Sequence, residues 1–209
     1  MAGRFMNGLV KATAYLPQMF IFRLKFHYED KNVQSRKIKG PAIIVSNHTS
    51  VYDYAADIFV FPGRTLRFQM AEVLFKKKLQ GWFLKCMGGI IVNRNAADYS
   101  YISKSKEILS KKGVVGVFPE GRLPRPGEER PISFKPGVAL LALESGVPVI
   151  PIYTTGGYWE KKDSHVIIGK PVYATDYLVE GASAKDNLQN IASGLRQKVI
   201  ELGELYGKG

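Results

Sequence analysis

Past residue 40, short apolar runs alternate along the chain with stretches whose apolar residues recur at helical spacing. Short runs rich in Val and Ile predict buried strands, and the helical spacing predicts amphipathic helices. The predicted strands cover residues 41–46, 66–71, 89–93, 113–118, 147–153 and 165–168. The predicted helices cover residues 53–61, 72–86, 97–112, 136–145 and 184–205. This alternation predicts an α/β fold, a single sandwich domain with a largely parallel central sheet flanked by helices.

The first 30 residues follow a different pattern. Apolar side chains recur at helical spacing up to Pro17, and an aromatic, cationic run then extends over residues 19–26. Such residues fit two short helices in a membrane interface, or two amphipathic helices packed on the domain's own core. We expect the first arrangement, with residues 1–30 as an N-terminal helical membrane-docking segment and residues 31–209 as the main domain. No run of 18 apolar residues occurs, so no ordinary transmembrane helix is predicted.

The positive charge is concentrated in the first half of the chain. The 209 residues carry a net charge of +12, and 45% of them are apolar, which excludes a disordered chain. Residues 1–40 hold eight basic and two acidic side chains, and residues 61–94 hold seven and one. An anionic partner therefore meets this half: nucleic acid, phospholipid headgroups or a phosphorylated substrate. One cysteine and three scattered histidines give no disulfide framework, and we expect no metal site.

Candidate chemistry follows the strand that ends at Ser46, because ligands of such folds bind beyond the carboxyl ends of strands. On one continuous helix, His48 and Asp53 would point about 140° apart. They can pair if His48 lies in a loop and a capping box of Ser50 and Asp53 starts the helix. Asp53 would then orient the imidazole, whose other nitrogen could take a proton from a hydroxyl. Spacing alone favours a simpler interpretation, in which Asp53 only caps the helix.

Three other segments place polar groups beside strands or helix starts. Glu120 and Gly121 follow a predicted strand, where they suit either a substrate hydroxyl or an ordinary turn. Arg94 follows another strand, where it suits a phosphate or stays solvated. Lys135 precedes Pro136 at a predicted helix start, where Pro is favoured in the first turn.

The order of these segments carries more information than any one of them. The series NHTSVYD, GGIIVNR, FPEGR and VPVIPIY, with FKPG, resembles the blocks of the glycerophospholipid acyltransferase family over residues 40–155. That family includes 1-acylglycerol-3-phosphate acyltransferases. The resemblance implies that His48 is a general base oriented by Asp53. It also implies a set of substrate-binding residues, namely Arg94, Glu120, Gly121, Arg122 and Lys135.

The same resemblance implies a reaction and a location. An acyl group passes from acyl-CoA or acyl carrier protein to the free hydroxyl of lysophosphatidate, giving phosphatidate. No covalent acyl-enzyme, metal or cofactor is expected. The implied partners are these substrates and a membrane phospholipid surface, at the cytoplasmic face of the cell membrane, with peripheral or monotopic attachment. Nucleic acid is not expected as a partner, because no recognition helix or aromatic–basic sheet pattern is evident.

One departure from the family pattern leaves the acceptor open. Many members read FPEGTRS, whereas here Arg122 follows Gly121 directly, so either Arg122 or Arg125, or neither, contacts the phosphate. The same chemistry could use glycerol-3-phosphate, another lysolipid or an acylated sugar. A non-catalytic basic module that binds anionic lipid, and a serine hydrolase acting through Ser50, are the alternatives of other classes. Residues 76–78 suit either a solvated helix face or contact with CoA, a carrier protein or a membrane.

Overall fold

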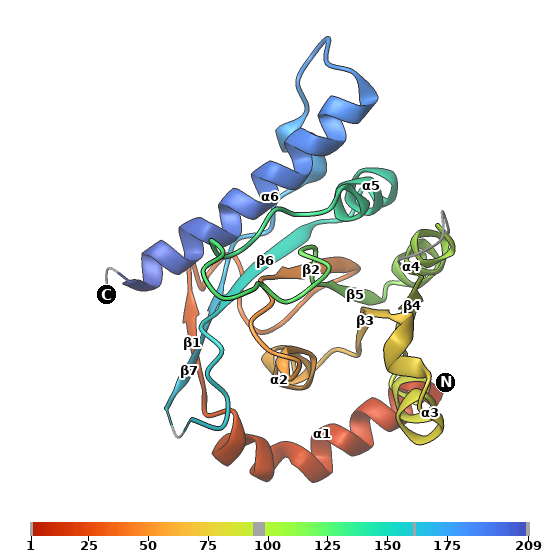
Figure 1. Ribbon diagram of the computed structural model, residues 1–209, viewed down its shortest axis with the longest axis vertical. Coiled ribbons are helices and arrows are strands. Elements are labelled where there is room, and N and C mark those ends of the chain that lie inside the picture. The colour runs from red at the N-terminus through yellow and green to blue at the C-terminus, as the bar shows by residue number, and fades with distance from the viewer. Residues whose placement is uncertain (1, 94–98, 161, 208–209) are drawn as a thin grey trace.

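A seven-stranded sheet runs through the centre of the molecule, and helices cover both of its faces (Figure 1). The computed structural model describes residues 2–93, 99–160 and 162–207. The strands are β1 (Leu24–Tyr28), β2 (Ala42–Ser46), β3 (Leu66–Ala71), β4 (Ile90–Val92), β5 (Val114–Val117), β6 (Val149–Thr154) and β7 (Ser164–Ile168). The α-helices are α1 (Ala2–Ile21), α2 (Asp53–Val60), α3 (Lys78–Cys86), α4 (Ser100–Ser110), α5 (Pro136–Ser145) and α6 (Ala184–Gly207). Two short 3₁₀ helices are η1 (Glu72–Phe75) and η2 (Ala174–Tyr177).

The strand order is β1-β7-β6-β2-β5-β3-β4. All neighbouring strands are parallel except β6 and β7, so the predicted α/β fold with a largely parallel sheet is confirmed. The central strand β2 lies between β5 and β6, and all five of its residues are buried. Its continuous apolar sequence suits this position, because a parallel strand covered on both faces has no solvent side.

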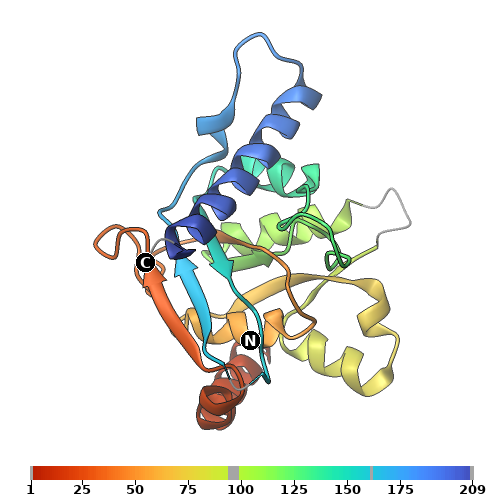
Figure 2. The same cartoon turned by 60° about the vertical axis from the view of Figure 1, so that its left-hand side comes forward.

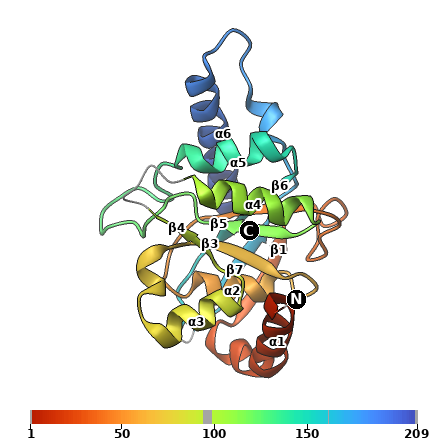
Figure 3. The same cartoon turned by 90° about the vertical axis from the view of Figure 1, so that its right-hand side faces the viewer.

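Two apolar cores lie on the two faces of the sheet. Ile44 of β2 packs into the core that also takes apolar residues of α1, α2 and α3. Its neighbours Ile43 and Val45 point to the other face, where α4, α5 and α6 complete the second core. This alternation follows from the two-residue period of a strand. Figure 3 shows the two helical layers on either side of the sheet.

The N-terminal segment differs from its prediction. One helix, α1, continues through Pro17 to Ile21, and the expected second helix is the edge strand β1. Figure 2 shows β1 beside β7, with which it pairs in parallel. Between Leu24 and Tyr28, partly buried side chains alternate with exposed ones, which is the period of a strand. Residues 19–26 are aromatic and cationic, as in an interfacial helix, so the alternation typical of a strand was not recognised in the sequence.

A second difference concerns the predicted helix over residues 72–86. It is divided into η1 and α3, with Lys76 and Lys77 between them. Gly81 allows the two pieces to pack closely, because a Cβ there would collide with the backbone oxygen of Phe75. The other predicted strands and helices past residue 40 are present, with ends that differ from the prediction by at most three residues.

Charged side chains match the dipole of α2, the helix that begins beside the predicted site. Asp53 lies in its first turn, where a negative charge is favourable. At its other end, Arg36 donates to the carbonyl oxygens of Val60 and Phe59 at 2.8 and 2.7 Å. Lys11 of α1 donates to the carbonyl oxygen of Phe61, and burial lowers the pKa of Lys11 to about 8. Both cations satisfy carbonyls that have no partner within the helix.

Candidate active site

His48 and Asp53 are hydrogen-bonded, as the sequence predicts. His48 lies in the loop after β2, and its Nδ1 is 2.7 Å from Asp53 Oδ2 at the start of α2. The side chain of His48 is one-fifth exposed. Among the described residues, no side chain or backbone group bonds Nε2 of this ring. The pair therefore leaves Nε2 available for a substrate proton.

Asp53 is fully buried and accepts four hydrogen bonds. Besides His48, the backbone N–H groups of Thr49 and Ser50 donate to Oδ2 at 2.6 and 2.9 Å, and Thr49 Oγ1 donates to Oδ1 at 2.9 Å. Four donors stabilise the ionised carboxylate, so the buried charge is solvated by the loop itself. The donors of this loop therefore hold an acceptor-only carboxylate at the Nδ1 edge of the imidazole.

The expected capping box is only half present. The backbone N–H of Ser50 donates to Asp53, but Ser50 Oγ accepts from the backbone N–H of Tyr52 at 3.2 Å. Among the residues that the structure describes, no hydrogen bond joins Ser50 to His48. The hydroxyl of Ser50 is therefore not arranged as a nucleophile activated by the histidine.

Glu120 holds the backbone on which His48 lies. Its side chain is 1% exposed, and its Oε1 and Oε2 accept from the backbone N–H groups of His48 and Ile132 at 2.7 and 3.0 Å. Burial raises the pKa of Glu120, and the two backbone hydrogen bonds oppose that rise. Both oxygens are engaged within the protein, so the carboxylate links the His48 loop to the loop before α5. The sequence predicts that Glu120 binds substrate, whereas in the structure both of its carboxylate oxygens bind backbone N–H groups of the protein.

Asn47 makes a second link that the sequence did not reveal. Its side chain donates to the carbonyl oxygen of Thr154 and accepts from the backbone N–H of Thr154, at 2.9 and 2.8 Å. This pair joins the ends of β2 and β6 directly beneath His48. Gly156 allows the loop after β6 to lie close to the His48 loop, because a Cβ there would lie 2.4 Å from Thr49 Oγ1. Asn47 directly precedes His48 in the NHTSVYD segment. This adjacency is the one feature of the sequence that could have pointed to Asn47.

A cavity of about 460 Å³ opens at the same edge of the sheet, past the carboxyl ends of β3, β4 and β5. Phe118 lies between this cavity and the histidine. Its ring lines the cavity and stacks on His48 with the ring centroids 4.5 Å apart. Three of the predicted substrate-binding residues line the cavity, namely Gly121, Arg122 and Lys135. The second, third and FKPG segments thus line one cavity, and the first segment adjoins it through the contact of His48 with Phe118.

The two cations of this cavity differ in their bonding. Arg122 makes two hydrogen bonds to the carboxylate of Glu128, at 2.7 and 2.8 Å. Lys135 is exposed, and among the described residues its ammonium makes no ion pair. Of these two cations, Lys135 is therefore the one whose charge is not already paired within the described residues. Arg94, predicted to bind phosphate, lies outside the described residues.

Metal-ligating side chains are scattered in the described part of the chain. No three His, Cys, Asp or Glu side chains there come together as a metal site requires.

Comparison with known proteins extends the match over most of the chain. The family model described as "Acyltransferase" matches residues 23–155. The chloroplastic 1-acyl-sn-glycerol-3-phosphate acyltransferase BAT2 of Brassica napus is 30% identical over 159 residues, covering 69% of this chain and 45% of that protein. The human 1-acyl-sn-glycerol-3-phosphate acyltransferase beta is 26% identical over 137 residues, covering 64% and 47%. The chain thus spans about half the length of these relatives.

A solved structure shares the fold. The crystal structure of the 1-acyl-sn-glycerophosphate acyltransferase PlsC from Thermotoga maritima superimposes with a TM-score of 0.64 at 20% identity, covering 96% of this chain and 79% of that one. The family match takes in the His48–Asp53 pair, the Glu120 link and the cavity beside them. On that match, the chain belongs to the acyltransferase family.

Proposed function

We propose that this protein transfers an acyl group from acyl-CoA or acyl carrier protein to the free hydroxyl of 1-acylglycerol-3-phosphate, giving phosphatidate. The observation that carries the proposal is the 2.7 Å His48–Asp53 pair beside a cavity that holds Lys135. The relatives named 1-acyl-sn-glycerol-3-phosphate acyltransferase support the choice of acceptor.

The proposed mechanism is general base catalysis without a covalent acyl-enzyme. Nδ1–H of His48 donates to Asp53, so Nε2 takes the proton of the acceptor hydroxyl as its oxygen attacks the thioester carbonyl. The tetrahedral intermediate then collapses, the carbon–sulfur bond breaks, and the imidazolium returns the proton to the leaving thiolate. Asp53 stabilises the imidazolium between these steps. Because a thioester is already activated, these steps use no metal or cofactor.

The acceptor phosphate is proposed to lie near Lys135. A phosphate attracts a lysine ammonium through charge-assisted hydrogen bonds. Arg122 can contribute only by leaving or sharing its bidentate contact with Glu128. The roles of Arg94 and Arg125 stay predictions.

Because Arg122 is engaged by Glu128, the phosphate contact that would select lysophosphatidate is not fixed. The second candidate is therefore the same chemistry on another acceptor, such as glycerol-3-phosphate or another lysolipid. A non-catalytic module that binds anionic lipid is the weaker alternative.

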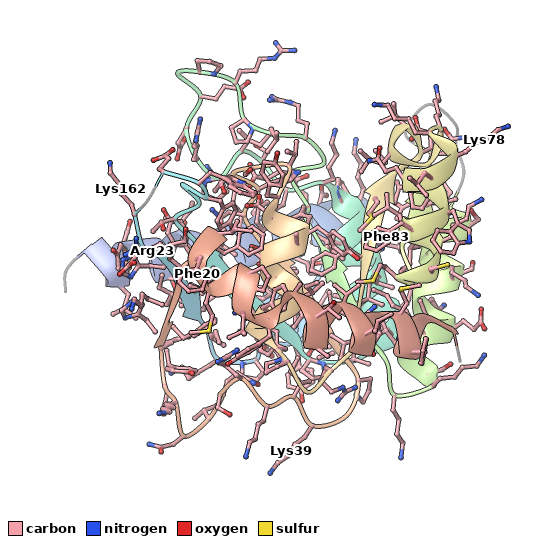
Figure 4. The ribbon with its side chains drawn as sticks, turned by 90° about the horizontal axis from the view of Figure 1, so that it is seen from below. Phe20, Arg23, Lys39, Lys78, Phe83 and Lys162 are labelled. Carbon is pink, nitrogen blue, oxygen red and sulfur yellow. The ribbon has the colours of Figure 1, made fainter. Side chains whose placement is uncertain are left out.

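Membrane docking by α1 forms part of the proposal. The outward side of α1 carries the exposed apolar residues Phe5, Leu16 and Phe20, of which Phe20 is 82% exposed (Figure 4). Its inward side carries polar Asn7 and Lys11, which bond to the body of the protein. An apolar outer face fits the interface of a bilayer better than water.

None of the described helices combines the length and apolar character needed to cross a bilayer. We propose peripheral or monotopic attachment, and the cytoplasmic face of the cell membrane stays a prediction. Replacing Leu16 and Phe20 together by Ser should weaken binding to phospholipid vesicles in a sedimentation assay. Leu205→Ser, an exposed residue of α6, is the matched control. Equal sedimentation of both variants would reject docking by α1.

A thioester-release assay tests the reaction. We expect acyl-CoA to release free thiol only when lysophosphatidate is present, with phosphatidate detected by mass. His48→Ala should slow release about 10²- to 10⁴-fold, the usual contribution of a general base. His27→Ala, a histidine on β1, is the matched control. Release that persists in His48→Ala contradicts the mechanism, and release without acceptor indicates a hydrolase.

A further inference from the structure

The helix α3 lies beside α1 on the same side of the molecule, as Figures 3 and 4 show. It follows β3 through η1, and the last three residues of β3 line the cavity beside the candidate active site. The position of α3 therefore bears on how a lipid reaches that cavity.

The outer surface of α3 is apolar. Leu79, Trp82 and Phe83 are exposed, at 79%, 57% and 36%. Their spacing of three and four residues places them on one face of the helix. Gly81 and Leu84, on its inner face, are buried. Large apolar side chains grouped on one outer face mark an interaction surface, and Trp favours the boundary between headgroups and acyl chains.

Positive charge surrounds this apolar face. Lys76, Lys77 and Lys78 precede or open the helix, and Lys85 lies in its last turn. Among the described residues, none of these four lysines forms an ion pair. The first three lie at the positive end of the helix dipole, where anionic residues are normally favoured. An anionic surface outside the protein would offset the repulsion between these lysines and the positive end of the helix dipole.

We propose that α3 is a second membrane-contacting helix, with Leu79, Trp82 and Phe83 in the interface of an anionic phospholipid bilayer and Lys76–Lys78 against its phosphates. The apolar face and the unpaired lysines together match such a bilayer in polarity and charge. Contact through α3 brings the β3 wall of the cavity to the lipid surface, where the proposed acceptor resides. This last step rests on the proposed function, whereas the contact of α3 itself does not.

Tryptophan fluorescence tests the contact directly. The chain has two tryptophans, so the Trp159→Phe variant leaves Trp82 as its only tryptophan. With vesicles of phosphatidylcholine and phosphatidylglycerol, we expect its emission to shift to the blue and lipids brominated on their acyl chains to quench it. An unshifted, unquenched Trp82 on vesicles that sediment the protein overturns the proposal. The Trp82→Phe variant, which reports from Trp159, shows whether any shift is specific to α3.

Charge removal is the second test. Replacing Lys76, Lys77 and Lys78 by Gln should weaken vesicle binding about fivefold per lysine, or about a hundredfold in all. The matched control replaces Lys104 and Lys106 of α4 and Lys111 directly after it, on the other face of the sheet. Equal binding by the two triple variants overturns the proposal, as does equal binding of the native chain to pure phosphatidylcholine.

Other occupants of this face give distinct results. If a second copy covers it, Leu79→Ser changes the molecular mass in solution without lipid, which overturns the proposal. If it receives an acidic carrier protein, the lysine variant loses transfer from that carrier while keeping full vesicle binding, which also overturns it. Thioester release in detergent is measured in parallel, so a failure of the proposed reaction is recognised separately from a failure of lipid contact.

Discussion

Asp53 and Asp57 lie four residues apart on α2 and are both fully buried, but only Asp53 is satisfied by hydrogen bonds. Asp53 accepts four, whereas neither oxygen of Asp57 has a partner among the described residues. Burial first, and then the charge of Asp53, raise the pKa of Asp57 well above its usual value. The helix therefore holds two buried carboxyl groups on the same side, one satisfied by four donors and one whose environment favours the neutral form.

This arrangement predicts a pH dependence of stability. Since the pKa of Asp57 is higher in the folded than in the unfolded protein, the folded state binds more protons between the two values. The free energy of unfolding therefore falls as pH rises through that window, by up to about 1.4 kcal/mol per pH unit. Asp57→Asn should flatten this slope in urea unfolding at a series of pH values. Asp163→Asn, which removes a partly exposed carboxylate, is the control. An unchanged slope in Asp57→Asn would show that Asp57 is ionised.

Asp53→Asn should abolish most of the proposed activity. Three donors, namely His48 Nδ1 and the backbone N–H groups of Thr49 and Ser50, converge on Oδ2, so the amide oxygen of Asn takes that position. The neutral amide then no longer stabilises the imidazolium that forms when Nε2 takes the proton. We expect a fall in kcat of about 10³- to 10⁴-fold. The KM for acyl-CoA should change little. A variant that folds and keeps more than a tenth of the native kcat would contradict the orienting role of Asp53.

Glu120→Gln should affect both stability and turnover. The amide retains one acceptor oxygen, so either the N–H of His48 or that of Ile132 is left unsatisfied. The expected loss is about 1–3 kcal/mol in the free energy of unfolding, together with a lower kcat, because His48 shifts. Chemical denaturation and steady-state kinetics measure the two effects. Glu144→Gln, at a surface ion pair, should change neither. A raised KM for the acceptor with native stability would instead place Glu120 in direct contact with substrate.

Lys135→Ala should raise the KM for lysophosphatidate by about tenfold to a hundredfold, the value of a charge-assisted hydrogen bond. Arg122→Ala should raise it less, because the guanidinium is already bonded to Glu128. Lys185→Ala, at the exposed start of α6, controls for net charge. The KM for an uncharged monoacylglycerol acceptor should not respond to Lys135→Ala. A larger rise in this KM in Arg122→Ala than in Lys135→Ala would indicate that Arg122, and not Lys135, contacts the phosphate.

Local sequence patterns determined most of the elements. The buried strand β2 and the helix α2 are predictable, because apolar periodicity reports which side of each element is buried. The prediction failed at β1, where a short alternating run of aromatic and cationic residues has the composition of an interfacial helix. Its partner β7 lies about 140 residues away in the sequence, and pairing at that distance leaves no local signal.

The order of the motifs, by itself, determined the family and the identity of the His48–Asp53 pair. Only the tertiary structure decided what surrounds that pair. Glu120 turned out to hold the backbone of His48 from 72 positions away, and Asn47 to join β2 to β6 across 107. Such contacts depend on strand order and on the loops that end each strand, which no local propensity encodes. The reason is physical: periodicity records whether a residue is buried, and only the assembled sheet decides which groups it is buried against.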